Sequence, residues 1–171
     1  LSIGAIELIK EYLPRAVANG QDIEAREAMV NAIFLGGMSF NNAGLGYVHS
    51  MAHQLGAVYN LPHGVCCAML LPVVERENAM RVPEAFRNVA KALGLHVEGK
   101  TDQECADYAI AEIEKLSETV GIPKKLTELG IQEKDFDFDY LSMNALIDAC
   151  APGNPFMPTL EETIALYKEL F

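Results

Sequence analysis

Three of the four histidines lie between positions 49 and 63, at His49, His53 and His63. His49 and His53 are four residues apart, so on a helix they lie about 40° apart on one face, one turn above the other. Pro62 would break a helix that ran through it, but it fits the first turn of a new helix. The spacing therefore predicts three imidazoles at a corner between two helices, where they could bind a metal ion.

The residue types leave the ligand set of such a site open. A zinc protease would have a glutamate directly after the first histidine, but Ser50 stands there. Catalytic divalent metals take at least three protein ligands and keep one position open, and no carboxylate lies within the cluster. Either His53 is the third ligand, or further ligands lie outside the chain. The alternative for a helical His-x-x-x-His pair is two partly buried histidines without a ligand role, together with one histidine at the surface.

Composition narrows the class of protein. The chain has 171 residues, of which 50% are hydrophobic and 22% charged, as in an ordinary globular protein. A net charge of −11 argues against nucleic acid and against an anionic membrane surface as partners. No apolar run reaches the ~18 residues of a membrane span. The four cysteines include no Cys-x-x-Cys pair, which favours a reduced, cytoplasmic protein. We interpret Cys66 and Cys67 as structural thiols.

Helical periodicity runs through almost the whole chain and no segment alternates like a strand, so the expected fold class is all-α with about eight helices. Thr101 with Glu104 and Thr159 with Glu162 predict capping boxes. The expected helices are 3–19, a second that begins at Asp22, the histidine helix at about 40–57, a fourth from Pro62, then 83–94, 101–121, 136–150 and a last one from Thr159.

The segment Phe40–Gly64 resembles the signature of the iron-dependent (group III) alcohol dehydrogenases. Leu70-Leu-Pro72, the loop from Cys150 to Pro155 and the opening Ala5-Ile-Glu-Leu-Ile are also similar to that family, so the resemblance covers essentially the whole chain. The branch of lactaldehyde reductases and 1,3-propanediol dehydrogenases is the most similar. The resemblance implies that residues 1–171 form the all-helical C-terminal metal-binding domain. It also implies an N-terminal α/β domain, absent from this chain, that binds NAD(H) or NADP(H).

The resemblance further implies roles for individual residues. Family members hold Fe(II), or Zn(II) in its place, with four protein ligands, two of which match His49 and His63. The other two belong to an Asp-x-x-x-His helix that would end just upstream of the chain. His53 matches a non-ligand residue near the nicotinamide, and we expect it to orient the cofactor or to relay the alcohol proton. Phe40 and Cys150 match positions that line the substrate pocket.

The implied reaction is the oxidation of small primary alcohols or diols, or the reverse reduction of aldehydes, in a homo-oligomer. We expect the chain alone to be inactive, and the apolar surface left by the missing half to make it associate. A stand-alone helical binding or interaction module with an incomplete metal site is the second hypothesis. A self-contained metalloenzyme with three histidine ligands is the third, and it requires His53 to bind the metal.

Overall fold

The computed structural model describes residues 1–171 and contains helices but no strand, which confirms the all-α prediction. The eight α-helices are α1 (Ser2–Ala18), α2 (Ile23–Ala43), α3 (Tyr47–Tyr59), α4 (His63–Arg81), α5 (Phe86–Ala92), α6 (Asp102–Thr119), α7 (Phe138–Ile147) and α8 (Leu160–Lys168). Short 3-10 helices η1 (Pro83–Ala85), η2 (Leu126–Leu129), η3 (Glu133–Asp135) and η4 (Ala151–Gly153) connect some of them. None of the helices has the length and apolar character needed to cross a membrane.

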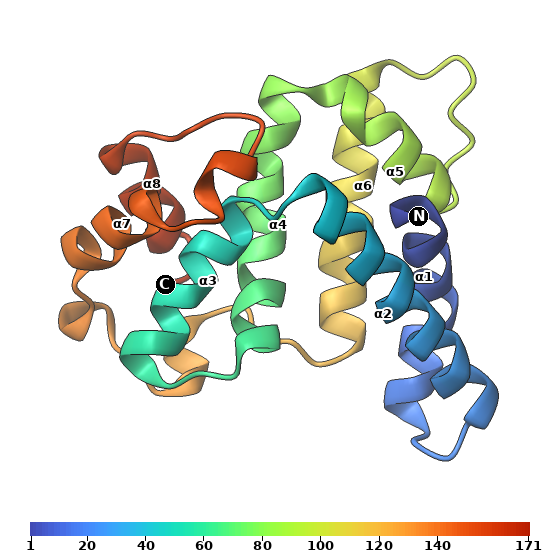
Figure 1. Ribbon diagram of the computed structural model, residues 1–171, viewed down its shortest axis with the longest axis horizontal. Helices are drawn as coiled ribbons and strands as arrows, with labels where there is room; N and C mark the ends of the chain where they lie inside the picture. The colour runs from blue at the N-terminus through green and yellow to red at the C-terminus, as the bar shows by residue number, and fades with distance from the viewer. The chain divides into compact units, whose positions relative to one another are not determined.

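The chain divides into two compact units, each with its own packed helices (Figure 1). The first unit comprises residues 1–44 and 82–120 and contains α1, α2, α5 and α6. The second comprises residues 45–81 and 121–171 and contains α3, α4, α7 and α8. His49, His53 and His63 all belong to the second unit, so the candidate site is built within one compact body.

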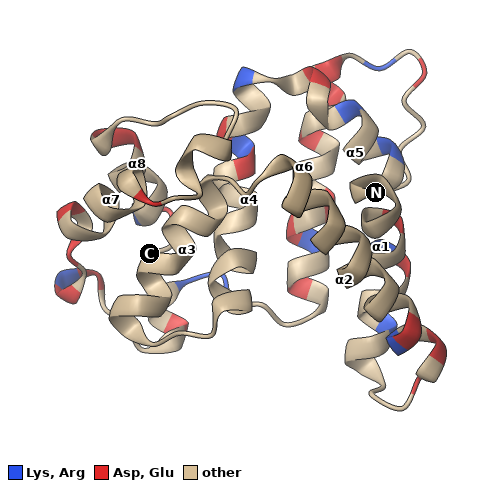
Figure 2. Ribbon diagram, viewed as in Figure 1, with Lys and Arg blue, Asp and Glu red and all other residues tan.

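In the first unit, α1 and α2 form a helical hairpin, and α6 packs against α5 and α1 (Figure 1). Asp22 caps α2 by accepting a hydrogen bond from the backbone N–H of Ala25 at 3.1 Å. The predicted capping box of Thr101 and Glu104 is confirmed at the start of α6. One face of α2 is apolar but exposed, and Figure 2 shows that the second half of this helix carries no charged residue. The exposed large apolar side chains of this helix are Ile23, Val30, Ile33, Phe34 and Phe40.

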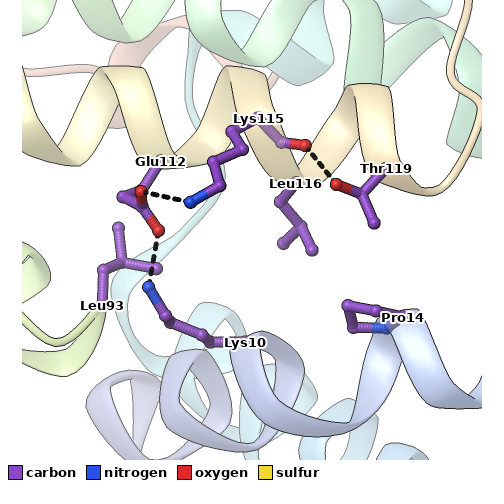
Figure 3. Close-up of a pocket in the computed structure, with 7 residues that line it drawn as sticks. All are labelled: Lys10, Pro14, Leu93, Glu112, Lys115, Leu116 and Thr119. Carbon is purple, nitrogen blue, oxygen red and sulfur yellow. Dashed lines mark hydrogen bonds and ion pairs between the residues drawn. The ribbon is translucent and has the colours of Figure 1, made fainter.

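A shallow cavity of about 190 Å³ lies between α1 and α6 in the same unit (Figure 3). Lys10 and Glu112 meet there as an ion pair of 2.6 Å, with Leu93, Leu116 and Pro14 around them. Lys115 also contacts the Glu112 carboxylate, at 3.2 Å, and no histidine or cysteine lines the cavity. The ion pair of Lys10 and Glu112 therefore links α1 to α6.

Replacing Glu112 with glutamine is expected to lower the free energy of unfolding at pH 7 by at most about 1 kcal/mol, as for other partly exposed ion pairs. The hydrogen bond from Lys10 holds the pKa of Glu112 below its usual value. The stabilisation is therefore present above the unfolded carboxyl pKa of about 4.3 and is lost as the pH falls through the lower folded pKa. Urea unfolding at a series of pH values from 7 into acid should show the difference decline below the unfolded carboxyl pKa, with Glu7→Gln as the control. A difference that does not decline as the pH falls would contradict this account.

The second unit is organised around α3. Tyr47, Met51 and Leu55 recur every four residues on this helix and are fully buried. The hydroxyl of Tyr167 on α8 donates to the carbonyl of Met51 at 2.9 Å. Figure 2 shows no charged residue on α3. His49 and His53 lie two positions after Tyr47 and Met51, about 200° around the helix, so the core face fixes α3 while the two histidines point away from it.

The predicted start of the histidine helix, at about residue 40 of the range 40–57, is wrong. The structure continues α2 to Ala43, breaks the helix at Gly44–Gly46, and begins α3 at Tyr47. Gly44 has φ = 83°, a conformation that residues with a side chain rarely adopt. The side-chain oxygen of Asn154 accepts a hydrogen bond from the backbone N–H of Tyr47 at 3.2 Å. This bond satisfies one of the free backbone donors at the start of α3. Phe40 therefore lies on the preceding helix.

The corner between α3 and α4 follows the prediction closely. Asn60 adopts a left-handed conformation with φ = 53° and ends α3. Pro62 precedes α4, and its carbonyl accepts the backbone N–H of Cys66 at 3.1 Å. His63 is the first residue of α4. The break that proline enforces thus places His63 at the mouth of the second helix.

The loop at 151–155 is fastened to the start of α3. The amide of Asn154 donates to the side-chain oxygen of Asn78 at 2.8 Å and to the carbonyl of Phe156 at 3.0 Å. Gly153 passes so close to the segment just before α3 that an added Cβ would overlap the carbonyl oxygen of Leu45. This contact holds the segment that follows Cys150 beside the helix that carries His49 and His53.

Replacing Gly153 with alanine is therefore expected to destabilise the second unit by about 1–3 kcal/mol, because the backbone must move to admit the methyl group. Thermal unfolding followed by circular dichroism measures the loss. Gly64→Ala is the matched control, since nothing lies within 4 Å of a Cβ placed there. Equal stability of the Gly153 and Gly64 variants would show that the loop is not tightly packed.

Candidate metal centre

The three histidines meet at the corner between α3 and α4. The ring centroids of His49 and His63 are 5.4 Å apart, those of His53 and His63 5.6 Å, and those of His49 and His53 6.1 Å. His49 and His53 are partly exposed and His63 is exposed. The structure therefore brings together the three side chains predicted to meet, in a place that an ion or a small molecule can reach.

One group of possible ligand atoms belongs to His49, His63 and Cys67, and these atoms all lie within 4.8 Å of one another. Cys67 follows His63 by one helical turn on α4, and its Sγ is 3.5 Å from His63 Nε2. Cys66 is fully buried, as expected of a structural thiol, whereas Cys67 is half-buried against the imidazole. Sequence reasoning missed the position of Cys67, although its i,i+4 spacing from His63 was a signal for it.

His53 belongs to a second group, with Asp148 and Cys150. The Nδ1 atom of His53 lies 3.0 Å from Asp148 Oδ2, and Gln54 donates to the same oxygen at 3.4 Å. The expectation that no carboxylate lies at the cluster is therefore wrong for His53. Asp148 is 95 positions from His53 in the sequence, so only the packing of α7 against α3 brings the two together.

The helix predicted at 136–150 is shorter than expected. It spans Phe138–Ile147, because Asp148 leaves the helical conformation with ψ = 144°. The Oδ1 atom of Asp148 accepts a hydrogen bond from the backbone N–H of Cys150 at 2.9 Å. A local bond of this kind from a side chain to the backbone competes with continuation of the helix. Asp148 thus holds His53 with one oxygen and the Cys150 backbone with the other.

The local electrostatics favour a neutral His49 and an ionised Asp148. Burial, followed by the nearby His63 and His53, lowers the pKa of His49. Burial alone would raise the pKa of Asp148, but the hydrogen bonds from the Cys150 backbone and from His53 outweigh it and lower that pKa. A metal ligand must be an unprotonated imidazole, so the environment of His49 suits that role.

The thiols are held in the protonated form. Burial, with a smaller effect of Cys66, raises the pKa of Cys67 to about 11. Burial and the charge of Asp148 raise the pKa of Cys150. Neither thiol is therefore activated as a nucleophile in the absence of a metal.

The two residues predicted to line the substrate pocket lie in different units. Cys150 is half-buried next to Asp148 in the second unit, whereas Phe40 lies near the end of α2 in the first, with 50% of its surface exposed. The substrate-pocket role of both residues stays a prediction.

Comparison with known proteins shows the family to which the chain belongs. The family model of the Fe-containing alcohol dehydrogenases, C-terminal part, matches residues 1–171. The chain is 46% identical over 167 residues to 1,3-propanediol dehydrogenase of Klebsiella pneumoniae and 43% identical over 167 residues to lactaldehyde reductase of Escherichia coli K12. A crystal structure of 1,3-propanediol oxidoreductase matches with a TM-score of 0.94 and 45% identity, over 99% of this chain and 44% of that one.

The chain therefore belongs to the iron-containing alcohol dehydrogenase family. The alignments to the two curated relatives cover 98% of this chain but 43% of each relative, so the chain spans less than half of their length. The family predicted from the Phe40–Gly64 segment is confirmed, and both relatives in the predicted branch are among the matches.

Proposed function

We propose that the chain is the metal-binding part of an alcohol dehydrogenase that oxidises small primary alcohols or diols with NAD or NADP, and reduces aldehydes in reverse. The observation that carries this proposal is the convergence of His49 and His63 from two helices, with donor atoms within 4.8 Å. Imidazole suits both iron and zinc as a ligand. The names of the relatives, which act on propanediol and lactaldehyde, support the substrate class.

His49 and His63 would hold Fe(II), or Zn(II) in its place, together with an aspartate and a histidine from an upstream Asp-x-x-x-His helix. When bound, the metal supplies Lewis acidity toward the alcohol oxygen, and the nicotinamide accepts the hydride. We assign nicotinamide binding mainly to an N-terminal α/β domain. The much greater length of the relatives supports a partner domain of this kind.

His53 would orient the cofactor or move the alcohol proton. Because Asp148 is ionised, the Nδ1 atom of His53 donates to it, which leaves Nε2 available as an acceptor. A histidine fixed in this way by a carboxylate is a common arrangement for proton transfer. Asp148 is thus a positioning residue in this proposal, and His53 is the group that contacts substrate or cofactor.

The exposed apolar surface and the free cysteines support two further parts of this proposal, an oligomeric protein and a reducing compartment. The exposed apolar face of α2 supports burial against another part of the protein or a second copy in a homo-oligomer. The four cysteines are all free, which supports a reducing compartment such as the cytoplasm. Cys150 and Phe40 would contact the alcohol.

Metal removal tests the proposed activity. In the protein that carries both domains, oxidation of 1,3-propanediol should require NAD or NADP, cease after treatment with a chelator under anaerobic conditions, and return when Fe(II) or Zn(II) is added. Turnover that resists complete metal removal would contradict the metal's role. A protein that binds metal but oxidises no alcohol would favour the stand-alone binding module instead.

A further inference from the structure

A pair of asparagine side chains, Asn78 and Asn154, joins the loop after Cys150 to helices α3 and α4. Asn78 on α4 is 3% exposed, and its Nδ2 donates to Asn154 Oδ1 at 3.3 Å. In return, Asn154 Nδ2 donates to Asn78 Oδ1 at 2.8 Å. The Oδ1 atom of Asn154 also accepts a hydrogen bond from the backbone N–H of Tyr47, the first residue of α3. The two amides therefore connect three segments that are far apart in the sequence.

The neighbours of the pair fix which way each amide points. A backbone N–H can only donate and a backbone carbonyl can only accept. The contacts of Asn154 with the N–H of Tyr47 and with the carbonyl of Phe156 therefore define its oxygen and its nitrogen. Asn154 orients Asn78 in turn, and Asn78 Nδ2 also donates to Glu75 Oε2 at 3.1 Å. Every polar side-chain atom of the two asparagines thus has a partner.

The segment from Asp148 to Asn154 is stiffened by its own backbone hydrogen bonds. The carbonyl of Asp148 accepts a hydrogen bond from the N–H of Ala151 at 3.0 Å, and the carbonyl of Ala151 accepts one from Asn154 at 3.1 Å. The N–H of Gly153 donates to the carbonyl of Cys150 at 3.1 Å. A displacement of Asn154 is therefore transmitted along the segment to Asp148.

Asn154 consequently holds both partners of the contact between His53 and Asp148. His53 lies on α3, which begins at the residue that Asn154 binds, and Asp148 begins the stiff segment that ends in Asn154. The contact of His53 Nδ1 with Asp148 Oδ2 at 3.0 Å closes a hydrogen-bonded ring. A group that transfers a proton must lie within about 2.6–3.2 Å of its partner, so small shifts in such a ring affect it.

We propose that Asn154 and its partner Asn78 are positioning residues for the dehydrogenase reaction, which act by setting the place of Asp148 against His53. This inference rests on the proposed function, because it requires His53 to orient the cofactor or move the alcohol proton. The effect of the asparagines on turnover passes through Asp148 and not through the bound metal.

A double-mutant cycle in the protein that carries both domains tests this route. Asn154→Ala and Asp148→Asn should each lower kcat on the order of 10-fold, with normal metal content and a smaller change in KM. If Asn154 acts through Asp148, the double variant should also be about 10-fold slower than the wild type. Independent effects would multiply to about 100-fold and would overturn the inference. Unchanged kcat or loss of metal in Asn154→Ala would overturn it as well.

Tyr167→Phe is the matched control, because it removes a different hydrogen bond to α3. The hydroxyl of Tyr167 donates to the carbonyl of Met51 at 2.9 Å, and Tyr167 lies on α8, outside the stiff segment 148–154. This variant should lose stability in thermal unfolding but keep its kcat. A fall in kcat equal to that of Asn154→Ala would show that any weakening of α3 slows the reaction, and the inference would be wrong.

Asn78→Ala is a second variant for the same cycle if Asn154→Ala does not fold, since Asn154 keeps its other hydrogen bonds. It should lower kcat less, and the loss should disappear when Asp148 is already asparagine. A loss of the same size in both backgrounds overturns only this inference, and the proposed function stands. If His53→Ala leaves kcat unchanged, the role of His53 in the proposed function fails and this inference fails with it.

Discussion

Replacing His63 with alanine in the protein that carries both domains is expected to remove the bound metal and reduce alcohol oxidation by about 10³-fold or more. A metal acting as a Lewis acid contributes several kcal/mol to the transition state, and each 1.36 kcal/mol is a factor of ten in rate. His63 is the first residue of α4 and its side chain is exposed, so the substitution leaves the core of the second unit intact. Loss of activity should therefore follow loss of metal and not loss of fold.

His96→Ala is the matched control for His63→Ala. His96 lies outside the cluster, and its side chain is 88% exposed beside Glu98. Metal content by elemental analysis, turnover with 1,3-propanediol and helix content by circular dichroism should be unchanged in this variant. If His63→Ala retained both its metal and its turnover, the assignment of His63 as a ligand would be wrong.

His53→Ala is expected to lower kcat by about 10²–10⁴-fold, the usual contribution of a general acid or base, while the metal content stays normal. The reason is that Asp148 engages His53 through Nδ1, whereas the donor atoms of His49 and His63 group with Cys67. Steady-state kinetics and elemental analysis of the same preparation separate the two effects. Loss of the metal from His53→Ala would instead support the hypothesis of a site with three histidine ligands.

Asp148→Asn provides a finer test of the same arrangement. It keeps a side chain of nearly the same shape, with one oxygen that can still accept the Cys150 backbone N–H, but it removes the charge that orders His53 Nδ1. We expect kcat to fall on the order of 10-fold, with a smaller change in KM, because outer partners of this kind orient the groups that react. An unchanged kcat would show that the carboxylate has only a structural role.

The helices and their ends could be predicted where the signal is local. Asp22, the capping boxes at Thr101 and Thr159, and the break at Pro62 all appear where the sequence indicates them. The break at Gly44–Gly46 was missed because apolar periodicity continues across it, while the hydrogen bond that fastens the new helix comes from Asn154, 107 positions away.

The histidine corner was predictable for the same reason, since its three members lie close together in the sequence. The partners of the histidines were not. Asp148 reaches His53 only through the packing of α7 on α3, and periodicity says nothing about which side chains of two packed helices meet. The position of Cys67 beside His63 was not predicted, because an adjacent pair of cysteines in an apolar run is typical of a buried helix. In the structure only Cys66 of this pair is fully buried.

Anomalous X-ray diffraction from crystals of the metal-loaded protein tests the central claim most directly, because it places the ion among the side chains. We predict a single peak at the iron or zinc absorption edge within about 2.0–2.2 Å of a ring nitrogen of both His49 and His63, with His53 hydrogen-bonded to Asp148 and not to the ion. A peak away from this pair, or one bound by His53 in place of either histidine, would contradict the account.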